Sequence, residues 1–471
     1  MKSTSTFAYS WVLSAIALIG LPLTVRPAEA QNPGNNAVYN SSNGVTFSLS
    51  FIDASVFIGN GNNQSSNICG AIYGILSGAF YNYPATGAVI DARGIGGSTA
   101  LTCPTGRTPW NNGTTTVNVP STILLPAGTI IIPGTWVLPN YTRLIGAGDA
   151  LAYLSTGTGT VSVGTTLQAC KSSINGCSFN PNETDMIDLG TPPLCAPECN
   201  SVSVENLTLD GLGQSLNGIV NANAQTGSHV DHVSLFQLLG TGLSLSGNAS
   251  NSGPYSNITF DTGGYSGVPS TVCASINGLN GTRGIHGLTC ISQTNDAQAA
   301  VLLDSSNNSL EDVRIVGFYD GIRVGANANA QSNVLVNIIG DTNPTGALGN
   351  APIIVVHTTS VGHTVSDLSI MGANIAPGGS SQTITIQDDL TGAQLKDTSV
   401  GIYALGEKAS GGYSRFTTSP NAVTWGVGVN APNTGSGGCS PGSLYSNANP
   451  SPNSPALYVC SVATGNWLAV K

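Results

Sequence analysis

The stretch Asn206-Leu-Thr-Leu209 opens a series of seven similar phrases, each of which starts with a polar or turn-forming residue. Two apolar residues follow at alternate positions, and the residue between them usually bears a hydroxyl group. The six later copies are His232-Val-Ser-Leu235, Asn257-Ile-Thr-Phe260, Gly287-Leu-Thr-Cys290, Asp312-Val-Arg-Ile315, Asn333-Val-Leu-Val336 and Asp367-Leu-Ser-Ile370. Successive copies begin 21 to 34 residues apart, a period that is typical of stacked repeats. Because apolar and polar residues alternate, the repeats are predicted to consist of β-strands.

A second short strand follows the first phrase in most repeats, about ten residues later. The four clearest examples are Gly218-Ile-Val220, Gly242-Leu-Ser-Leu245, Ala300-Val-Leu-Leu303 and Gly321-Ile-Arg-Val324. The sequence shows no helical periodicity long enough for a crossover helix between parallel strands. Parallel strands that are joined by turns form a coil, in which each rung stacks on the previous one at roughly 4.8 Å.

The stretches Ile123-Leu-Leu-Pro-Ala-Gly-Thr129 and Leu144-Ile-Gly-Ala-Gly148 lead into the repeats. Together with the repeat length and the recurring phrase, they resemble the right-handed parallel β-helix of the pectate-lyase-like superfamily over about residues 117–390. The resemblance implies an all-β fold, a right-handed single-stranded parallel β-helix. It implies no single activity, because that superfamily includes lyases, hydrolases, epimerases, phage tailspikes and non-catalytic surface proteins.

Residues 1–30 are typical of a secretory signal peptide. Lys2 precedes an apolar run from Trp11 to Leu23, and Ala28-Glu-Ala30 offers small residues where a signal peptidase cuts. The run is too short to span a bilayer. We therefore expect cleavage after Ala30 and a secreted or cell-surface protein without a transmembrane segment.

The rest of the chain divides into three regions. Residues 31–116 are predicted to form a lead-in and an N-terminal cap with a short helix at Ile68–Leu76, because an open repeat stack needs capping. Residues 117–400 form the predicted β-helix, with a looped insertion at Leu151–Asn200. Residues 401–471 are rich in aromatic side chains and are predicted to form a small C-terminal β module. It either caps the coil or stacks on glycans.

The ten cysteines fall into five local couples, which favours disulfides in a secreted protein. Nearest-neighbour pairing is our prediction, although other connectivities are open. The couples are Cys69/Cys103, Cys170/Cys177, Cys195/Cys199, Cys273/Cys290 and Cys439/Cys460. No CxxC couple is present and the five histidines are scattered. The sequence therefore predicts neither a metal site nor a cofactor.

The chain carries little charge for its length. Only 8% of its residues are charged, against about 25% in average proteins, and the net charge is −10. The absence of a basic run argues against nucleic acid or an anionic membrane as a partner. Solubility must come from neutral polar groups. Such a surface suits an extracellular polysaccharide, although a solvated repeat surface explains it equally well.

The strand alternation assigns the repeats an inward and an outward column. The apolar positions of each phrase are predicted to face the core. The residues between them are predicted to face outward, namely Thr208, Ser234, Thr259, Thr289, Arg314, Leu335 and Ser369.

Four carboxylates lie beside the outward column. Asp210 and Asp261 should be two rungs apart, roughly 9.5 Å, and inverting glycosidases separate their two carboxyls by roughly 6.5–9.5 Å. Glu205 and Asp231 should be on adjacent rungs, where one carboxyl raises the pKa of the other. In a hydrolase, Asp210 and Asp261 would serve as acid and base, and the other pair would position substrate or tune pKa.

Five further residues are candidates for substrate binding near these carboxylates. They are Phe236, His232, His286, Arg314 and Arg323. An arginine among them would suit a uronate carboxylate.

A turn requirement explains the same aspartates and histidines without any catalysis. Polygalacturonase-like members of the superfamily carry a complete set of Asn-Thr-Asp, Asp-Asp, Gly-His-Gly and Arg-Ile-Lys motifs. This sequence has the fragments Leu209-Asp210, Asp231-His232 and Gly321-Ile-Arg-Val324, and its one true pair, Asp388-Asp389, lies far from them at the end of the repeats. The preferred hypothesis is therefore a secreted protein that binds polysaccharide or serves at a surface. The alternative is a polysaccharide-active enzyme, a glycoside hydrolase before a pectate-type lyase.

Overall fold

The structure, a computed structural model, describes most of residues 51–341 and shorter stretches after them. The described ranges are 51–61, 64–80, 88–149, 151–153, 160–162, 164–190, 194–195, 198–247, 251–265, 270–292, 299–341, 354–356, 365–366, 368–375, 386–388, 402–403, 425–428, 444–447, 450, 456–461 and 466–470. The predicted signal peptide and Cys439 lie outside them. None of the helices in these ranges is long and apolar enough to cross a membrane.

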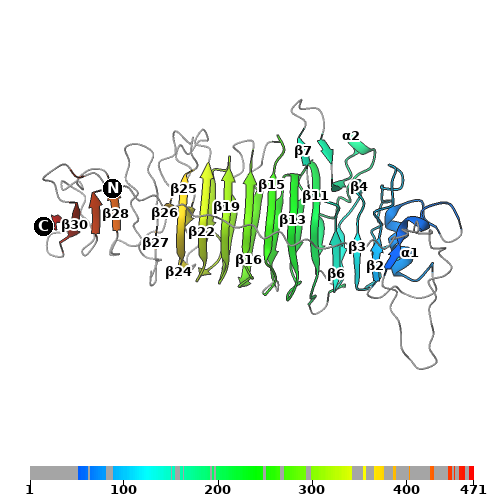
Figure 1. Ribbon diagram of the computed structural model, residues 1–471, viewed down its shortest axis with the longest axis horizontal. Coiled ribbons are helices and arrows are strands. Elements are labelled where there is room, and N and C mark those ends of the chain that lie inside the picture. The colour runs from blue at the N-terminus through cyan, green and yellow to red at the C-terminus, as the bar shows by residue number, and fades with distance from the viewer. Residues whose placement is uncertain are drawn as a thin grey trace, which may run out of the picture. The chain divides into compact units, whose positions relative to one another are not determined.

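Two long parallel sheets make up the fold (Figure 1). The first sheet contains, in order, β1 (Phe51–Asp53), β2 (Ala88–Asp91), β3 (Ser121–Leu124), β6 (Thr142–Ile145), β11 (Ser203–Gln214), β13 (His229–Leu238), β15 (Tyr255–Asp261), β17 (Ile285–Ile291), β19 (Ser309–Val316), β22 (Val334–Asp341), β25 (Ser369–Ile375) and β27 (Ile402–Tyr403). Two more strands of this sheet branch from β11, because β9 (Thr165–Ala169) pairs with β11 and β4 (Gly128–Ile132) pairs with β9. The second contains β5 (Trp136–Leu138), β10 (Asp185–Leu189), β12 (Asn217–Asn221), β14 (Thr241–Ser246), β16 (Val272–Asn280), β18 (Ala299–Ser306), β20 (Asp320–Val324), β23 (Ile354–Val356) and β26 (Ile386–Asp388).

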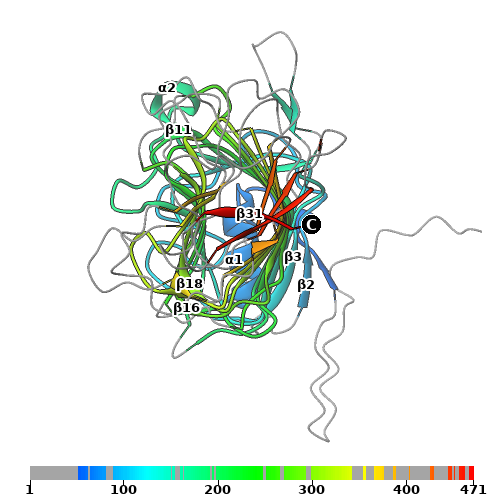
Figure 2. The same ribbon diagram turned by 90° about the vertical axis from the view of Figure 1, so that its left-hand side faces the viewer.

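The chain alternates between the two sheets, so that β11 and β13 of the first sheet enclose β12 of the second in sequence. In Figure 2, β2 and β3 lie on the opposite side from β16 and β18. This alternation of parallel strands confirms the predicted all-β parallel β-helix, and the four predicted second strands appear as β12, β14, β18 and β20.

The inward column of the phrases forms the core, as the alternation predicted. Leu207 pairs with Val233, Val233 with Ile258 and Ile258 with Leu288, and all four side chains are buried. Each such side chain contributes about 1.5–3 kcal/mol by leaving water. The stacked apolar columns therefore stabilise the coil and fix its register.

The first residue of the phrase bends each strand in its middle. This column has a left-handed backbone, with φ of 55° at Asn206, 52° at His232, 54° at Asn257, 67° at Gly287 and 56° at Asp312. Asn, Asp and Gly tolerate that conformation better than other residues. The first residue of the phrase was predicted to form a turn. The structure shows instead a bend inside a strand and not at its end.

The phrase at Asn333 does not occupy this bend, and its predicted register was wrong. Val313 pairs with Ile338, so Asn337 takes the bend position with φ of 52°. Leu335 is fully buried and does not face outward. The shift arises because Asn333 resembles the phrase in sequence but has another structural role.

The Asn333 side chain is buried and forms a hydrogen bond to the neighbouring rung. Its Oδ1 accepts a hydrogen bond from the backbone N–H of Asn308 at 2.9 Å. In the next rung, Ser369 pairs with Val334, so the phrase at Asp367 is also out of register.

The predicted insertion at Leu151–Asn200 was also wrong in extent, because β9 and β10 lie within it and belong to the two sheets. The first half of β11 pairs with β6 and its second half pairs with β9. The insertion therefore interrupts a single rung between Ile145 and Thr165, and it contains the hairpin of β7 (Leu151–Tyr153) and β8 (Thr160–Ser162).

The predicted helix is present as α1 (Ile68–Leu76), next to the 3-10 helix η2 (Ala54–Phe57). Asn67 Oδ1 accepts a hydrogen bond from the N–H of Gly70 at 2.8 Å and caps the helix N-terminus. Ile68, Ile72 and Ile75 are fully buried, so the helix covers the end of the core beside β2 (Figures 1 and 2).

Four predicted disulfides are confirmed, and they are Cys69–Cys103, Cys170–Cys177, Cys195–Cys199 and Cys273–Cys290. Cys460 is disulfide-bonded, and its pairing with Cys439 stays a prediction. Disulfides of this kind persist in oxidising compartments.

The remaining elements are short. In the C-terminal part, β28 to β31 form a separate sheet in which Tyr445 packs against Trp467, with ring centroids 5.7 Å apart. Those strands are β28 (Trp425–Gly428), β29 (Leu444–Asn447), β30 (Leu457–Cys460) and β31 (Trp467–Ala469), and the other elements are α2 (Ser172–Asn175), β21 (Ala330–Gln331) and β24 (Val365–Ser366).

Candidate functional site

The predicted carboxylate columns are formed in the first sheet. Asp210 pairs with Phe236, and Phe236 pairs with Asp261. Glu205 pairs with Asp231 on the adjacent rung. The sequence therefore placed the columns correctly, and the contacts of each side chain decide what the columns can do.

Glu205 is surrounded by donors from its own rung and both neighbouring rungs. Arg143 Nη2 donates to Oε1 at 2.9 Å, Ser203 Oγ donates to Oε1 at 2.7 Å, and His229 Nε2 lies 3.3 Å from Oε1. The hydrogen bond from His229 outweighs the effect of burial and, with those from Ser203 and Arg143, lowers the pKa of Glu205 to about 2. Glu205 in turn raises the pKa of His229. Glu205 is therefore a permanent anion in an internal network and cannot serve as a general acid.

Asp231 and His232 form a second pair on the next rung. Burial by itself would raise the pKa of Asp231, but hydrogen bonds from Ser256 (2.6 Å), His232 (2.8 Å) and Asn257 (3.0 Å) outweigh it and lower the pKa. The bonds from Ser256 and Asn257 connect Asp231 to the adjacent rung, whereas His232 belongs to the same strand as Asp231. They hold the bend column in place whatever else the residues do.

His286 repeats the arrangement two rungs further along. Its Nδ1 lies 3.1 Å from Glu311 Oε2, and Ser309 Oγ donates to Glu311 Oε1 at 2.8 Å. One edge of the first sheet thus carries three histidine–carboxylate pairs.

Asp210 is 4% exposed, and its carboxyl is occupied by protein groups. Gln168 Nε2 donates to Oδ2 and the N–H of Leu212 donates to Oδ1, both at 2.9 Å. Burial raises the pKa of Asp210, and the hydrogen bonds and the nearby Lys171 ammonium only partly oppose it. Asp261 likewise accepts a bond from the N–H of Gly263, at 2.7 Å. Both aspartates therefore stabilise tight turns, as the turn interpretation expected.

The residues predicted to bind substrate do not form one face. Phe236 is buried at 3% exposure, between the two aspartates. Arg314 is exposed on the first sheet. Arg323 belongs to β20 of the second sheet, where its Nε bonds Asp320 Oδ2 at 2.6 Å. The predicted face between Glu205 and Arg323 is thus divided between two sheets.

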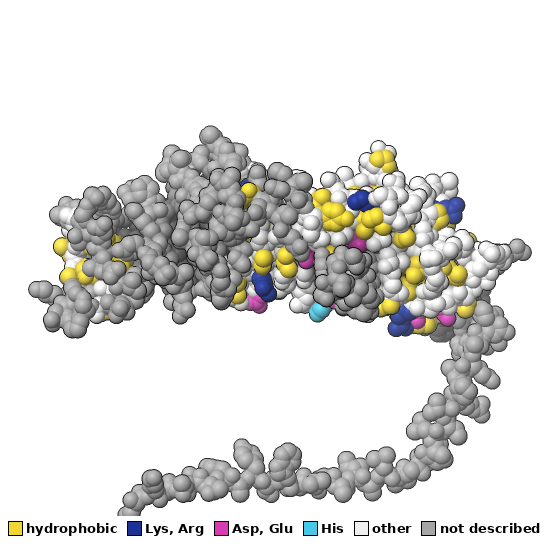
Figure 3. All heavy atoms as spheres, turned by 90° about the horizontal axis from the view of Figure 1, so that it is seen from above, with side chains coloured by type: hydrophobic (Ala, Val, Ile, Leu, Met, Phe, Trp, Pro, Cys, Tyr) yellow, Lys and Arg dark blue, Asp and Glu magenta, His cyan; other side chains and the backbone are white. Residues whose placement is uncertain are grey.

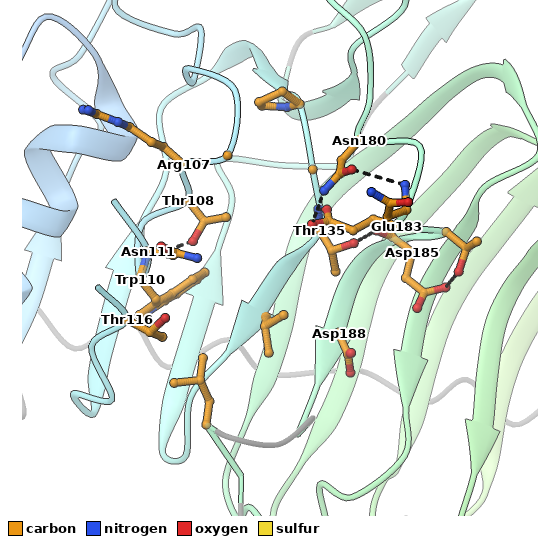
Figure 4. Close-up of a pocket in the computed structure, with 17 residues that line it drawn as sticks. Arg107, Thr108, Trp110, Asn111, Thr116, Thr135, Asn180, Glu183, Asp185 and Asp188 are labelled. Atoms are coloured by element: carbon orange, nitrogen blue, oxygen red, sulfur yellow. Dashed lines mark hydrogen bonds between the residues drawn. The ribbon is translucent and has the colours of Figure 1, made fainter. Parts of the chain in front are cut away.

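A cavity of about 360 Å³ lies elsewhere, where the N-terminal cap meets the first rungs of the second sheet. Figure 4 shows Arg107 and Thr108 on one side and Thr135, Glu183 and Asp185 on the other. We call this the cap cavity. Its lining residues are Gly106, Arg107, Thr108, Trp110, Asn111, Thr116, Pro133, Gly134, Thr135, Val137, Asn180, Asn182, Glu183, Thr184, Asp185, Asp188 and Leu194.

The acidic wall of the cap cavity is fixed by hydrogen bonds. Both oxygens of Glu183 accept, one from the N–H of Thr135 at 2.5 Å and one from Asn180 Nδ2 at 2.7 Å. Asp185 Oδ1 accepts from Asn217 Nδ2 at 2.7 Å and from Thr184 Oγ1 at 3.1 Å. The carboxylates therefore stand in fixed positions before any ligand arrives.

The opposite wall is anchored by Trp110, which is fully buried. Its ring meets the ring of Trp136 edge to face, with the ring centroids 6.0 Å apart. The N–H of Val117 donates to the carbonyl of Trp110 at 2.8 Å, which closes the base of this loop. Aromatic pairs of this geometry contribute about 0.5–1.5 kcal/mol beyond their buried area.

Three of the four described disulfides flank the segments that line the cap cavity. Cys103 precedes Gly106, Cys177 precedes Asn180, and Cys195 follows Leu194. The fourth, Cys273–Cys290, links β16 to β17 further along the coil. The cross-links are therefore concentrated at the cap cavity, where they restrain both walls.

Sequence reasoning missed this cavity, because its walls come from three separated segments outside the repeats. The available signal was a cluster of Asn, Glu and Asp at 180–188, next to cysteines that were assigned to a looped insertion. Within the described ranges, no group of three or more His, Cys, Asp or Glu side chains is arranged to hold a metal ion.

Outside these sites, charged side chains are sparse on the described surface. Figure 3 shows one face, on which a few scattered charged side chains lie among hydrophobic side chains, other uncharged side chains and backbone. This agrees with a charged fraction of 8%.

No protein-family model and no curated protein matches this chain. Among solved structures, the mannuronan C-5 epimerase A-module of Azotobacter vinelandii is similar at 15% identity and a TM-score of 0.28, over 77% of this chain and 100% of that one. DFA-IIIase from Arthrobacter chlorophenolicus A6, without its lid and in complex with GF2, matches at 12% identity and a TM-score of 0.35, over 78% and 93% of the two chains. Tailspike protein 3 of bacteriophage CBA120 matches at 10% identity and a TM-score of 0.17, over 89% and 69%. Likenesses of this size carry no argument about activity, so the function must be argued from the sites themselves.

Proposed function

We propose that the chain is a secreted protein that binds a short segment of an extracellular polysaccharide in the cap cavity, without chemical change. The observation that carries this proposal is the lining of the cavity. It presents donors from Arg107 and the asparagines beside acceptors from Glu183 and Asp185, on walls that are already ordered. A sugar hydroxyl is at once a donor and an acceptor, so it needs both kinds of partner within one site.

The dimensions suit a short glycan segment. Ligand pockets range over about 300–1,000 Å³, and a cavity of about 360 Å³ lies at the small end of that range. Walls that are held by disulfides and hydrogen bonds need little ordering on binding, which leaves more of the contact energy for affinity.

Binding is favoured over hydrolysis by the state of the carboxylates. Both oxygens of Glu183 and one oxygen of Asp185 already accept hydrogen bonds from neutral protein groups, whereas a general acid must donate a proton to its substrate. They suit a role as fixed acceptors for hydroxyl groups.

A glycoside hydrolase on the first sheet is the second candidate, and one observation favours it. Burial raises the pKa of Asp210, as a general acid requires. In that case, a screen for new reducing or unsaturated ends would show turnover, and both Asp210→Asn and Asp261→Asn would abolish it.

The two candidates are separated by one pair of arginine variants. A panel of plant and microbial polysaccharides is screened for binding, and the best uncharged ligand is titrated against Arg107→Ala and Arg314→Ala. Both arginines are exposed, but Arg107 lines the cap cavity and Arg314 lies on the first sheet. Binding in the cap cavity predicts a loss of about tenfold for Arg107→Ala and no change for Arg314→Ala, since a hydrogen bond to a charged group contributes about 1.5–3 kcal/mol. The reverse pattern would refute the proposal.

A further inference from the structure

The cap cavity has an excess of negative charge. Glu183, Asp185 and Asp188 line it together with a single cation, Arg107. Three carboxylates against one guanidinium leave a formal charge of −2. The precursor chain has a net charge of −10, so the rest of the molecule does not supply a compensating positive field.

The hydrogen bonds to two of these carboxylates do not cancel their charge. Glu183 is held by a backbone N–H and an asparagine amide, and Asp185 is held by an asparagine amide and a threonine hydroxyl. All these donors are neutral, so none of them brings a positive charge that would offset the carboxylates. Asp188 is 8% exposed, which places a further carboxylate in the wall away from bulk water.

A recessed site strengthens the effect of such charges on a ligand, because it focuses their electric field. One unit charge about 8 Å from a ligand charge, at an effective dielectric constant of about 20, changes affinity by more than about tenfold. Because the carboxylates are fixed in advance, a cationic ligand gains this attraction without reorganising the wall. An anionic ligand meets the same charge as repulsion.

We infer that the cap cavity selects glycans that carry free amino groups and rejects those that carry uronates. This inference rests on the proposed sugar binding and names its ligand class. An arginine on the first sheet would instead attract uronates, so the two sites predict opposite ligand preferences.

The test uses a matched series of β-1,4-linked tetrasaccharides built from glucosamine, N-acetylglucosamine, glucose or glucuronate units. They are titrated calorimetrically at pH 5.5 and low salt, where the amines are protonated and the carboxyls are ionised. The first two ligands differ by acetyl groups that remove the positive charge. We expect the glucosamine tetramer to bind at least tenfold more tightly than its acetylated form, and the glucuronate tetramer to bind most weakly.

Charge variants identify the source of the preference. Glu183→Gln and Asp185→Asn should each reduce the ratio between the amino and acetylated tetramers several-fold. Glu311→Gln, on the first sheet, should leave it unchanged. In the wild-type protein, raising NaCl from 50 to 500 mM should also reduce the ratio, which tests the charge without any substitution.

The outcomes separate the inference from the proposed function. Equal affinity for the amino and acetylated tetramers, tighter binding of the glucuronate tetramer, or no binding of the glucosamine tetramer would each overturn the inference. Sugar binding in the cap cavity would survive these results if other glycans of the panel still bind and Arg107→Ala still weakens them. Loss of all panel binding would overturn both.

Discussion

Replacing Glu205 by glutamine should destabilise the coil in a manner that depends on pH. The carboxylate accepts bonds from Arg143, Ser203 and His229, which come from three successive rungs. The variant keeps the size of the side chain and removes the charge, so it leaves Arg143 and His229 without their common anion.

The magnitude follows from the pKa. The folded pKa of Glu205 is about 2, below its ordinary value of 4.5, and at about 1.4 kcal/mol per unit this corresponds to at most roughly 3–4 kcal/mol of stability. The Glu205 side chain is 13% exposed, so solvent screens the interaction only slightly. Because the folded pKa is lowered, the contribution is complete above about pH 4.5 and is lost as the pH falls towards 2. The pKa of His229 is raised, so its contribution is present below 6.5 and is lost as the pH rises through its folded pKa.

Urea unfolding of the wild-type protein and Glu205→Gln should therefore differ most between about pH 4.5 and 6.5, and the difference should vanish near pH 2. Glu311→Gln is the matched control four rungs away, where the side chain is 41% exposed and a surface pair contributes about 0–1 kcal/mol. A difference between the wild type and Glu205→Gln that stays constant from pH 7 to pH 2 would refute this reasoning.

Two further predictions concern the bend and the cross-links. Asn257→Val should destabilise the coil by about 1–2 kcal/mol more than Asn257→Gly in urea unfolding, because a β-branched residue resists φ of 54°, and equal losses would contradict a bend requirement. Removal of Cys195–Cys199 by paired serine substitutions should weaken glycan binding, whereas removal of Cys273–Cys290 should lower thermal stability with little effect on affinity. Equal effects on affinity would show that the cross-links do not organise the cavity.

The repeat could be recognised in the sequence because each rung places two requirements on residue type. An inward pair such as Leu207 and Leu209 must be apolar, and the bend at Asn206 must tolerate a positive φ. Both leave a mark on residue type, so the fold and the paired columns were predictable. The same marks misled at Asn333, where an asparagine in front of three apolar residues is buried for its hydrogen bonds to Asn308 and Ser305.

The cap cavity was not predictable for a different reason. Its walls join residues near 107, 135 and 183, which are distant in sequence and belong to no repeat. Each residue taken alone is an ordinary polar loop residue. Only the pairing of β5 with β10, together with the loop anchored by Trp110, brings them to one place.

Hydrogen exchange of the backbone amides, with and without a saturating glycan, tests the central claim most directly. Binding in the cap cavity predicts slower exchange in peptides that cover residues 104–117 and 180–190, and unchanged exchange in peptides that cover β11 and β13. Slower exchange confined to β11 and β13 would contradict the account and would return the function to the carboxylates of the first sheet.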